Sequence, residues 1–473
     1  MKTSARILFL ASTAALVAIA SLTALGETDT RSLLPNLYPF SNPSGQLKTL
    51  GASGALDLSN PFFQSLGTNG RSCGSCHLPD QGWSISASKV QDRFDATSGQ
   101  DPIFRTNDGS NCDMGIDTST LGGRQNAYSL LTSRGLIRVA IDVPDTAEFD
   151  IVSVKNPYGC NSKSTPSMYR RPLPSANLRA LSTLMWDGRE SFAPPTQPIT
   201  FATNPGDLRL DLQHQSVSAT LGHAQADTAP TAAQQRDIVD FEMALSTAQA
   251  MDNDAGDLGT LGATGGPVSL SQQQFYVGIN DSLGGNPTGA TFTPIVFSLF
   301  GQWSDLRDSA PAAAAKRAIA RGEALFNSRT INITGVGGLN DDLNAVSIAG
   351  TCGTCHDSPN FGNHSLPVPL NIGVSDVDGP LDLSYLPIFT LRNKTTHRTV
   401  KTTDPGRALI TGKWKDIGKL KGPILRGLAS RAPFFHNGSA ATLADVIEFY
   451  NTRFNMGLTQ QEESDFVAFL QAL

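Results

Sequence analysis

The sequence has little charge and, beyond its first residues, no apolar run long enough to cross a bilayer. Asp, Glu, Lys and Arg make up 16% of the 473 residues, and the formal net charge is −6. Proteins that bind nucleic acids carry basic surfaces, so we expect no nucleic-acid partner. After residue 26 no segment reaches the ~18–20 apolar residues that a spanning helix needs.

The N-terminal segment, residues 1–26, has the pattern of a secretory signal peptide. Lys2 and Arg6 form a charged start, and the apolar stretch from Ile7 to Ala20 is too short for a transmembrane helix. An uncleaved membrane anchor is the alternative. We expect a periplasmic protein with no membrane span once the signal is removed.

Cysteine is also scarce, with six residues, of which four stand in two CxxC pairs. Cys112 and Cys160 are left over. In the oxidising compartment that a signal peptide implies, two spare thiols tend to pair, so we expect a disulfide between them. Two free buried thiols are the alternative.

Both CxxC pairs are followed at once by a histidine. Two thiols at this spacing on a helical turn reach the two vinyl groups of one porphyrin, and the next imidazole becomes the proximal iron ligand. A zinc site would pair the two CxxC motifs and leave both histidines unexplained, and a redox CxxC needs a βαβ context. We therefore predict two covalently attached c-type haems. Their attachment residues are Cys73, Cys76 and His77 for the first, and Cys352, Cys355 and His356 for the second.

Glycine and proline are frequent, with 44 and 28 residues, and alternating strand-like runs are few. This composition predicts a mainly α fold in which long loops join the helices. Apolar residues at helical spacing, with Pro or Thr at several starts, predict four of these helices. They cover residues 232–251, 311–327, 442–454 and 459–473. No internal repeat is evident apart from the paired CxxCH motifs.

Several segments of the chain together resemble the bacterial di-haem cytochrome c peroxidases. They are the two CxxCH motifs and the stretches "LMWDGRESF" (184–192) and "LKGPILRGLASRAPFFHNGSAATLADVIEFYN" (420–451). The MauG proteins belong to the same superfamily. The resemblance implies two cytochrome c-like haem domains that face each other. We expect an N-terminal domain with the peroxidatic haem, a helical and Gly-rich connector, and a C-terminal domain with the electron-transfer haem. They cover residues 27–205, 206–311 and 312–473.

The resemblance assigns roles near the first haem to Trp186, Gln197 and Asp207. Trp186 matches a tryptophan that lies between the haems and shortens the path for electrons; a buried aromatic that anchors a turn is the alternative. Gln197 and Asp207 match a distal pair, in which a carboxylate takes a proton from bound peroxide and returns it to the leaving oxygen. A surface Asp in a Pro-Gly turn is the alternative for Asp207.

Tyr450 stands fourteen residues after His436, where the peroxidases have a methionine that ligates the second haem and MauG-like proteins have a tyrosine. The resemblance therefore implies Tyr450 as an iron ligand. An anionic oxygen stabilises oxidised iron, whereas a thioether favours the reduced state. Tyr450 also belongs to an apolar stripe typical of a helix core, and Met456 is a competing ligand.

Histidine is missing between His77 and Trp186, where many of these peroxidases carry a residue that blocks the first haem. We expect the far face of that iron to be open unless His223 reaches it. The family's calcium ligands correspond here to Ser164 and Arg431, and a guanidinium beside a hard cation is unfavourable. A calcium site of that kind is therefore not expected.

These expectations predict a di-haem oxidoreductase that reduces hydrogen peroxide. Its electrons would come from a small periplasmic donor protein, a cytochrome c or a cupredoxin. One alternative is MauG-like oxidation of a protein or organic substrate through a high-valent di-haem state, which Tyr450 favours. Another is a di-haem cytochrome that only carries electrons.

Overall fold

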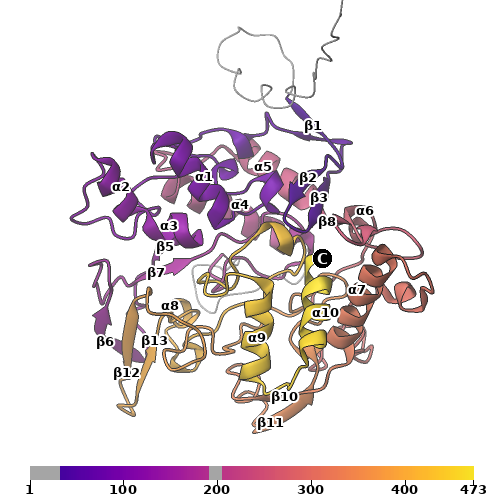
Figure 1. The fold of residues 1–473 in the computed structure, drawn as a ribbon. Coiled ribbons are helices and arrows are strands. Elements are labelled where there is room, and N and C mark those ends of the chain that lie inside the picture. Colours follow the sequence, from indigo (N-terminus) through magenta and orange to yellow (C-terminus); the bar gives the residue numbers. More distant parts are fainter. Residues whose placement is uncertain (1–31, 191–204) are drawn as a thin grey trace, which may run out of the picture.

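The structure, a computed structural model, describes residues 32–190 and 205–473 (Figure 1). The expected signal segment and Gln197 lie outside these residues. Helices account for about 30% and strands for about 16% of the described chain. Helix is the larger class, but the strand content is too high for a mainly α fold, which corrects the expectation from composition. None of the described helices combines the length and apolarity needed to cross a membrane.

The helices of the described residues are short, apart from α4 and α7. They are α1 (Ala87–Thr97), α2 (Leu121–Ala127), α3 (Ser129–Arg134), α4 (Pro205–Gly222), α5 (Ala232–Ala244), α6 (Pro267–Ser271), α7 (Pro311–Ser328), α8 (Ala408–Thr411), α9 (Leu443–Arg453) and α10 (Gln460–Gln471). The strands are β1 (Leu33–Pro35), β2 (Phe40–Asn42), β3 (Gly45–Leu50), β4 (Ala55–Asp57), β5 (Ile137–Ala140), β6 (Phe149–Lys155), β7 (Ser167–Arg170), β8 (Ser246–Asp252), β9 (Gly256–Asp257), β10 (Ile331–Thr334), β11 (Ser347–Gly350), β12 (Ile388–Asn393) and β13 (Thr399–Thr402).

Three of the four helices predicted from the sequence are confirmed as α7, α9 and α10. Thr442 and Thr459 cap α9 and α10, each in a capping box with an acidic residue three positions on. The three helices pack together, with α10 between α9 and α7 in Figure 1. A Cβ added at Gly322 of α7 would lie 2.0 Å from the carbonyl oxygen of Asp465, so a glycine is needed where α10 crosses.

The fourth prediction, a helix over 232–251, is only half correct. Helix α5 ends at Ala244, and residues Ser246–Asp252 form strand β8, which pairs with β3. The first four residues of β8 are all buried. An amphipathic helix would expose part of this segment, whereas a strand inside the sheet β2-β3-β8-β9 buries both faces.

Two sheets join regions that lie far apart in the sequence. β6 pairs with β12, so the sheet β13-β12-β6, at the lower left of Figure 1, contains strands from both expected haem domains. β3 near the N-terminus pairs with β8 of the connector. The two halves of the chain are therefore fastened to each other by backbone hydrogen bonds.

The structure also contains an internal repeat that the sequence did not reveal. Residues 177–190 and 427–440 share one backbone pattern: a positive-φ residue, a 3-10 turn, a second positive-φ residue and a glycine. Each ends in an isolated antiparallel bridge, Leu184 to Glu190 and Phe434 to Ala440. Trp186 and His436 occupy equivalent places, which corrects the expectation that only the CxxCH motifs recur.

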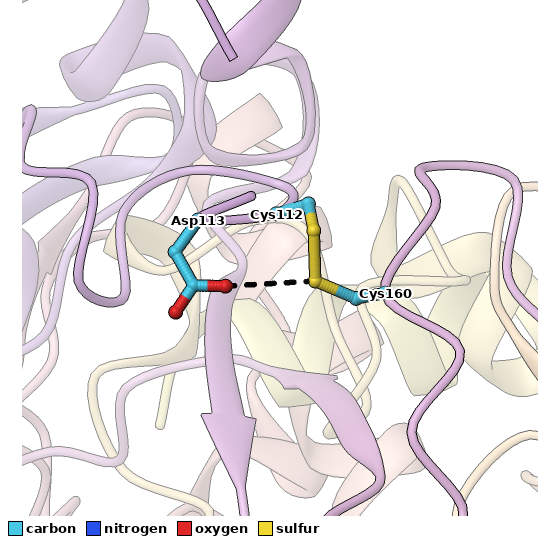
Figure 2. Close-up of side chains that lie close together, drawn as sticks. All are labelled: Cys112, Asp113 and Cys160. Carbon is cyan, nitrogen blue, oxygen red and sulfur yellow. Dashed lines mark hydrogen bonds between the residues drawn. A yellow bond between two sulfur atoms is a disulfide. The ribbon is translucent and has the colours of Figure 1, made fainter. Parts of the chain in front are cut away.

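The predicted disulfide between Cys112 and Cys160 is confirmed (Figure 2). Asp113 lies beside it, with a carboxylate oxygen 3.7 Å from Cys160 Sγ, and pairs with Arg138 at 2.7 Å. Because both thiols are consumed in the bond, this group offers no metal site. The disulfide ties the segment before α2, which contains Cys112, to the loop between β6 and β7, which contains Cys160.

Removing this disulfide is expected to destabilise the protein without affecting the haems. The bond closes a separation of 48 residues, for which the chain-entropy model gives up to ~4 kcal/mol. The double variant Cys112→Ser/Cys160→Ser should therefore unfold at lower urea concentration, with an unchanged visible haem spectrum. A midpoint equal to that of the wild type would show that the closed loop contributes no stability.

Candidate functional site

The two CxxCH motifs fold in the same way. Each begins with a 3-10 turn, Cys73–Ser75 or Cys352–Thr354. The backbone N–H of the residue before the turn, Ser72 or Thr351, donates to the side-chain hydroxyl of the last residue in it at 3.0 Å. In each motif the backbone N–H of the histidine donates to the carbonyl of the first cysteine, at 3.0 Å. The two thiols and the imidazole of each motif consequently line one cavity.

The ring of each motif histidine is oriented by a backbone carbonyl. His77 Nδ1–H donates to the oxygen of Trp83 at 3.0 Å, and His356 Nδ1–H donates to the oxygen of Gly362 at 2.6 Å. A carbonyl only accepts, so the proton sits on Nδ1 and the Nε2 lone pair is left for a metal. Burial lowers the pKa of both rings and keeps them neutral.

The first cavity is lined by apolar side chains together with several charged ones. The apolar lining comes from segments far apart in the chain: Leu66, Ile137, Leu173, Leu184, Leu212 and Ile424. Together with two thiols and an oriented imidazole, this lining fits a c-type haem. The second cavity has the same donor set in a still more apolar wall, which includes Phe326, Ile333, Leu370, Ile447, Phe454 and Phe466. Both cavities therefore suit the cofactor that the sequence predicts.

His223, at the end of α4, lines the first cavity together with His77. Its Nδ1 hydrogen-bonds to the Asp108 carboxylate, which also pairs with Arg71. Burial opposes ionisation of Asp108, but His223 and Arg71 outweigh it and hold the pKa of this carboxyl below its ordinary value. The imidazole is thus fixed through Nδ1, and Nε2 is the atom left to exchange a proton or bind a metal.

Glu242 of α5 also lines the first cavity, and sequence reasoning missed it. Its side chain is 6% exposed, and burial raises its pKa to about 8. At neutral pH this carboxyl is therefore protonated and can act as a donor. The sequence indicates its burial only by spacing: Glu242 stands four and three positions after Ile238 and Val239, the other buried residues of the same helix.

The second cavity contains Tyr450 together with His356, as the resemblance implied. The Tyr450 ring stacks on Phe454, with ring centroids 6.2 Å apart. Burial raises the pKa of the Tyr450 hydroxyl, and the neighbouring Cys355 and Cys352 raise it further. Met456 lines the same cavity, so both candidate ligands are close to the motif. Tyr450 as a ligand remains a prediction.

Trp186 lines both cavities, and it forms part of the wall between them. Its indole N–H donates to the Arg171 carbonyl at 2.8 Å, and its ring meets the His436 ring edge-on at 6.0 Å. The backbone N–H of Lys421 donates to the Trp186 carbonyl at 2.8 Å. The indole and the backbone of Trp186 are therefore each held by a hydrogen bond.

Asp187, the residue after Trp186, belongs to a buried network of ion pairs. Arg170 binds Asp404 through two hydrogen bonds of 2.7 and 2.8 Å and pairs also with Asp187, and all three are buried. His436 lies 3.7 Å from Asp404, and burial lowers its pKa to about 4. A neutral His436 therefore packs against the indole without adding charge.

The described residues do not test the predicted distal pair of Gln197 and Asp207. Gln197 lies outside them. Asp207 stands in the first turn of α4 but is not among the described residues that line the first cavity. Asp207 affects Asp211 in the same helix. Burial is the main cause that raises the pKa of Asp211 to about 7, and the negative charges of Asp207 and Glu190 raise it further. The role of Asp207 stays a prediction, whereas His223 is a titratable side chain that lines the cavity, as Asp108 and Glu242 also do.

The positions considered for calcium contain no carboxylate. Ser164 is exposed. The Arg431 guanidinium is buried and donates to the carbonyls of Ile424, Arg426 and Gly427. Those three oxygens are therefore engaged by a cation of the chain itself.

Curated proteins similar to the chain are peroxidases. It is 31% identical over 142 residues to the cytochrome-c peroxidase IdrP1 of Denitromonas iodatirespirans, and 27% identical over 142 residues to IdrP1 of Pseudomonas sp. strain SCT. Over this part of its length the chain is similar to bacterial cytochrome-c peroxidases, in agreement with the resemblance seen in the sequence. Both matches cover 26% of the chain and 36% of the relative, so the chain spans about a third of the length of these peroxidases.

Other comparisons are weaker. The cytochrome c551 peroxidase of Nitrosomonas europaea is 36% identical over 74 residues, which is 15% of the chain and 22% of that peroxidase. A MauG-like protein associated with microbial copper homeostasis aligns over 95% of both chains at 16% identity, with a TM-score of 0.38. A variant of the diheme peroxidase BthA from Burkholderia thailandensis aligns over 93% of both chains at 16% identity, with a TM-score of 0.28. No family model matches the chain.

Proposed function

We propose that this chain is a periplasmic di-haem oxidoreductase that reduces hydrogen peroxide to water. The observation that carries the proposal is Trp186, which lines two cavities that are each built around one CxxCH motif. Reduction of one peroxide takes two electrons and two protons and gives two waters. A protein with two one-electron sites and a path between them suits this stoichiometry.

A haem in the first cavity would supply the redox-active iron at which peroxide is reduced. His77 Nε2 would hold that iron. His223 Nε2, opposite the Nδ1 that is fixed by Asp108, would take a proton from peroxide and return it to the leaving oxygen. Asp207 and Gln197 remain the alternative pair for this step.

The second cavity would receive electrons from a small periplasmic donor protein, a cytochrome c or a cupredoxin. His356 Nε2 and the Tyr450 oxygen would hold its iron, and Trp186 would carry electrons from there to the first site. We place the two sites in two cytochrome c-like domains, residues 27–205 and 312–473, with 206–311 as the connector. The sheet β13-β12-β6 would hold these domains face to face.

The first test is the EPR spectrum of the ferric holoprotein, combined with its rate of peroxide reduction. A high-spin signal from an open first iron and steady peroxide consumption are expected. His223→Gln should lower kcat/KM for peroxide by about 10²–10⁴-fold, the usual contribution of a general base, with both haems still attached. Asp207→Asn should then have a much smaller effect.

Other outcomes have definite meanings. A large loss of kcat/KM in Asp207→Asn, with little loss in His223→Gln, would assign the proton transfer to Asp207. A low-spin first haem that becomes high-spin in His223→Gln would make His223 an iron ligand. Low-spin signals only, with no peroxide consumption, would mean that the chain is an electron carrier and would refute the proposal.

Tyr450 favours a second candidate, MauG-like oxidation of a protein or an organic molecule. An anionic oxygen ligand stabilises oxidised iron at the second site, which would let both sites hold oxidising equivalents. In that case peroxide would be consumed without a donor protein, because the two electrons that it takes would come from an added organic substrate that is oxidised. A strict requirement for a reduced donor protein favours the peroxidase.

A further inference from the structure

A buried cluster of two carboxylates and an imidazole lies beside the second CxxCH motif. It consists of Asp281, Asp357 and His364, which are 1%, 0% and 6% exposed. One ligand atom from each residue lies within 4.8 Å of the others. None of the roles assigned above to the two cavities uses these three side chains.

Two segments of the chain build the cluster. Asp357 and His364 belong to the turn after His356, in which the Ser365 N–H donates to Asp357 Oδ1 at 2.6 Å. Asp281 belongs to a connector loop that docks on this turn, where the Gly278 N–H donates to the Ser365 carbonyl at 3.1 Å.

One oxygen of each carboxylate is occupied and the other is not. Asp281 Oδ2 accepts the N–H groups of Leu283 and Gly285 at 3.1 and 2.6 Å. Asp281 Oδ1 and Asp357 Oδ2 have no hydrogen-bond partner, and both nitrogens of His364 are likewise unpartnered. His364 Nδ1 lies 3.1 Å from Asp357 Oδ2, but the two do not form a hydrogen bond of acceptable geometry.

Two ionised carboxylates buried this deeply are costly without positive charge between them, and that charge would come either from a protonated His364, 3.1 Å from Asp357, or from a bound cation. We propose that Asp281, Asp357 and His364 bind a divalent first-row transition-metal ion, such as Zn²⁺ or Mn²⁺. A proton shared between His364 and the carboxylates is the competing account, and the experiment below separates the two.

The donor set selects the class of metal. An imidazole nitrogen with two carboxylate oxygens suits Zn²⁺ or Mn²⁺, whereas Ca²⁺ and Mg²⁺ prefer oxygen ligands alone. Zinc bonds of ~2.0–2.1 Å in a tetrahedron place neighbouring ligand atoms about 3.3 Å apart. The 3.1 Å between His364 Nδ1 and Asp357 Oδ2 is close to this spacing.

The position of the cluster indicates a structural role. Asp357 follows His356 directly, and His364 lines the second cavity. Ser282, next to Asp281, donates to the Thr354 carbonyl of the motif turn at 2.7 Å. A metal ion here would clamp the connector loop onto the haem-binding turn and stabilise the second site.

The test uses the full holoprotein after treatment with a chelator and dialysis, titrated with Zn²⁺, Mn²⁺ and Ca²⁺ separately. We expect one zinc per chain, bound more tightly than manganese and far more tightly than calcium. Zinc should raise Tm by at least ~3 °C. Asp281→Asn should weaken zinc binding at least ~100-fold and abolish this shift. Asp254→Asn, an exposed connector residue, is the matched control and should bind as the wild type does.

The titration of wild-type protein decides the proposal even where Asp281→Asn folds poorly. No rise in Tm with either zinc or manganese, equal metal affinity in the two variants, or tighter binding of calcium than of both transition metals would each overturn it. The result does not depend on peroxide chemistry, because it is read from metal content and thermal unfolding.

Discussion

Trp186→Leu is expected to lower peroxide turnover about 100-fold while both haems remain attached. Trp186 lines both cavities, so removing the indole lengthens the path between the two sites and leaves the donor set of each intact. A loss of that size corresponds to ~2.7 kcal/mol of activation free energy. The measurement is single-turnover kinetics, in which binding and electron transfer between the sites are resolved separately.

Two variants control for packing. Trp186→Phe keeps an aromatic ring in the wall and should lose much less rate than Trp186→Leu. Trp414→Leu removes an indole that packs beside Phe149 and Leu409, away from both cavities, and should lower stability without slowing transfer. If electron transfer between the two sites is as fast in Trp186→Leu as in the wild type, the indole only anchors its turn.

Tyr450→Met should change the visible spectrum and raise the reduction potential of the second haem, by on the order of 100 mV or more. The replaced ligand is an oxygen anion that stabilises oxidised iron, and the new ligand is a thioether that favours reduced iron. Burial raises the pKa of the Tyr450 hydroxyl, so its ionisation depends on a nearby metal cation. Spectroelectrochemical titration measures the shift.

Met456→Leu is the matched variant, because Met456 lines the same cavity as Tyr450. With Tyr450 as the ligand, Met456→Leu leaves spectrum and potential unchanged. The opposite pattern, an altered spectrum in Met456→Leu and none in Tyr450→Met, would assign the ligand to Met456 and remove the observation that favours MauG-like chemistry.

Local sequence patterns predicted what depends on local interactions. The CxxCH spacing predicted the two donor sets, because a single turn brings its thiols and imidazole together. Capping residues predicted the starts of α9 and α10 to within a residue, since Thr442 and Thr459 satisfy backbone N–H groups of the first turn. The disulfide followed from counting, because Cys112 and Cys160 were the only cysteines outside the motifs.

Contacts between distant segments could not be predicted in the same way. Strand β8 was taken for helix because its burial on both faces depends on β3, about two hundred residues earlier. The internal repeat was hidden because Asn177 and Gly427 both tolerate a positive φ although their side chains differ. His223 reaches Asp108 only through the fold, so its oriented imidazole had no local signal.

The central claim is that two haem sites act together, through Trp186, on one peroxide. Its most direct test is stopped-flow mixing of the fully reduced holoprotein with one equivalent of hydrogen peroxide, followed at the absorption bands of both haems. The account predicts that one equivalent oxidises both haems in the wild type, and that the second haem is oxidised far more slowly in Trp186→Leu. Oxidation of only one haem per peroxide in the wild type, or of neither, would contradict it.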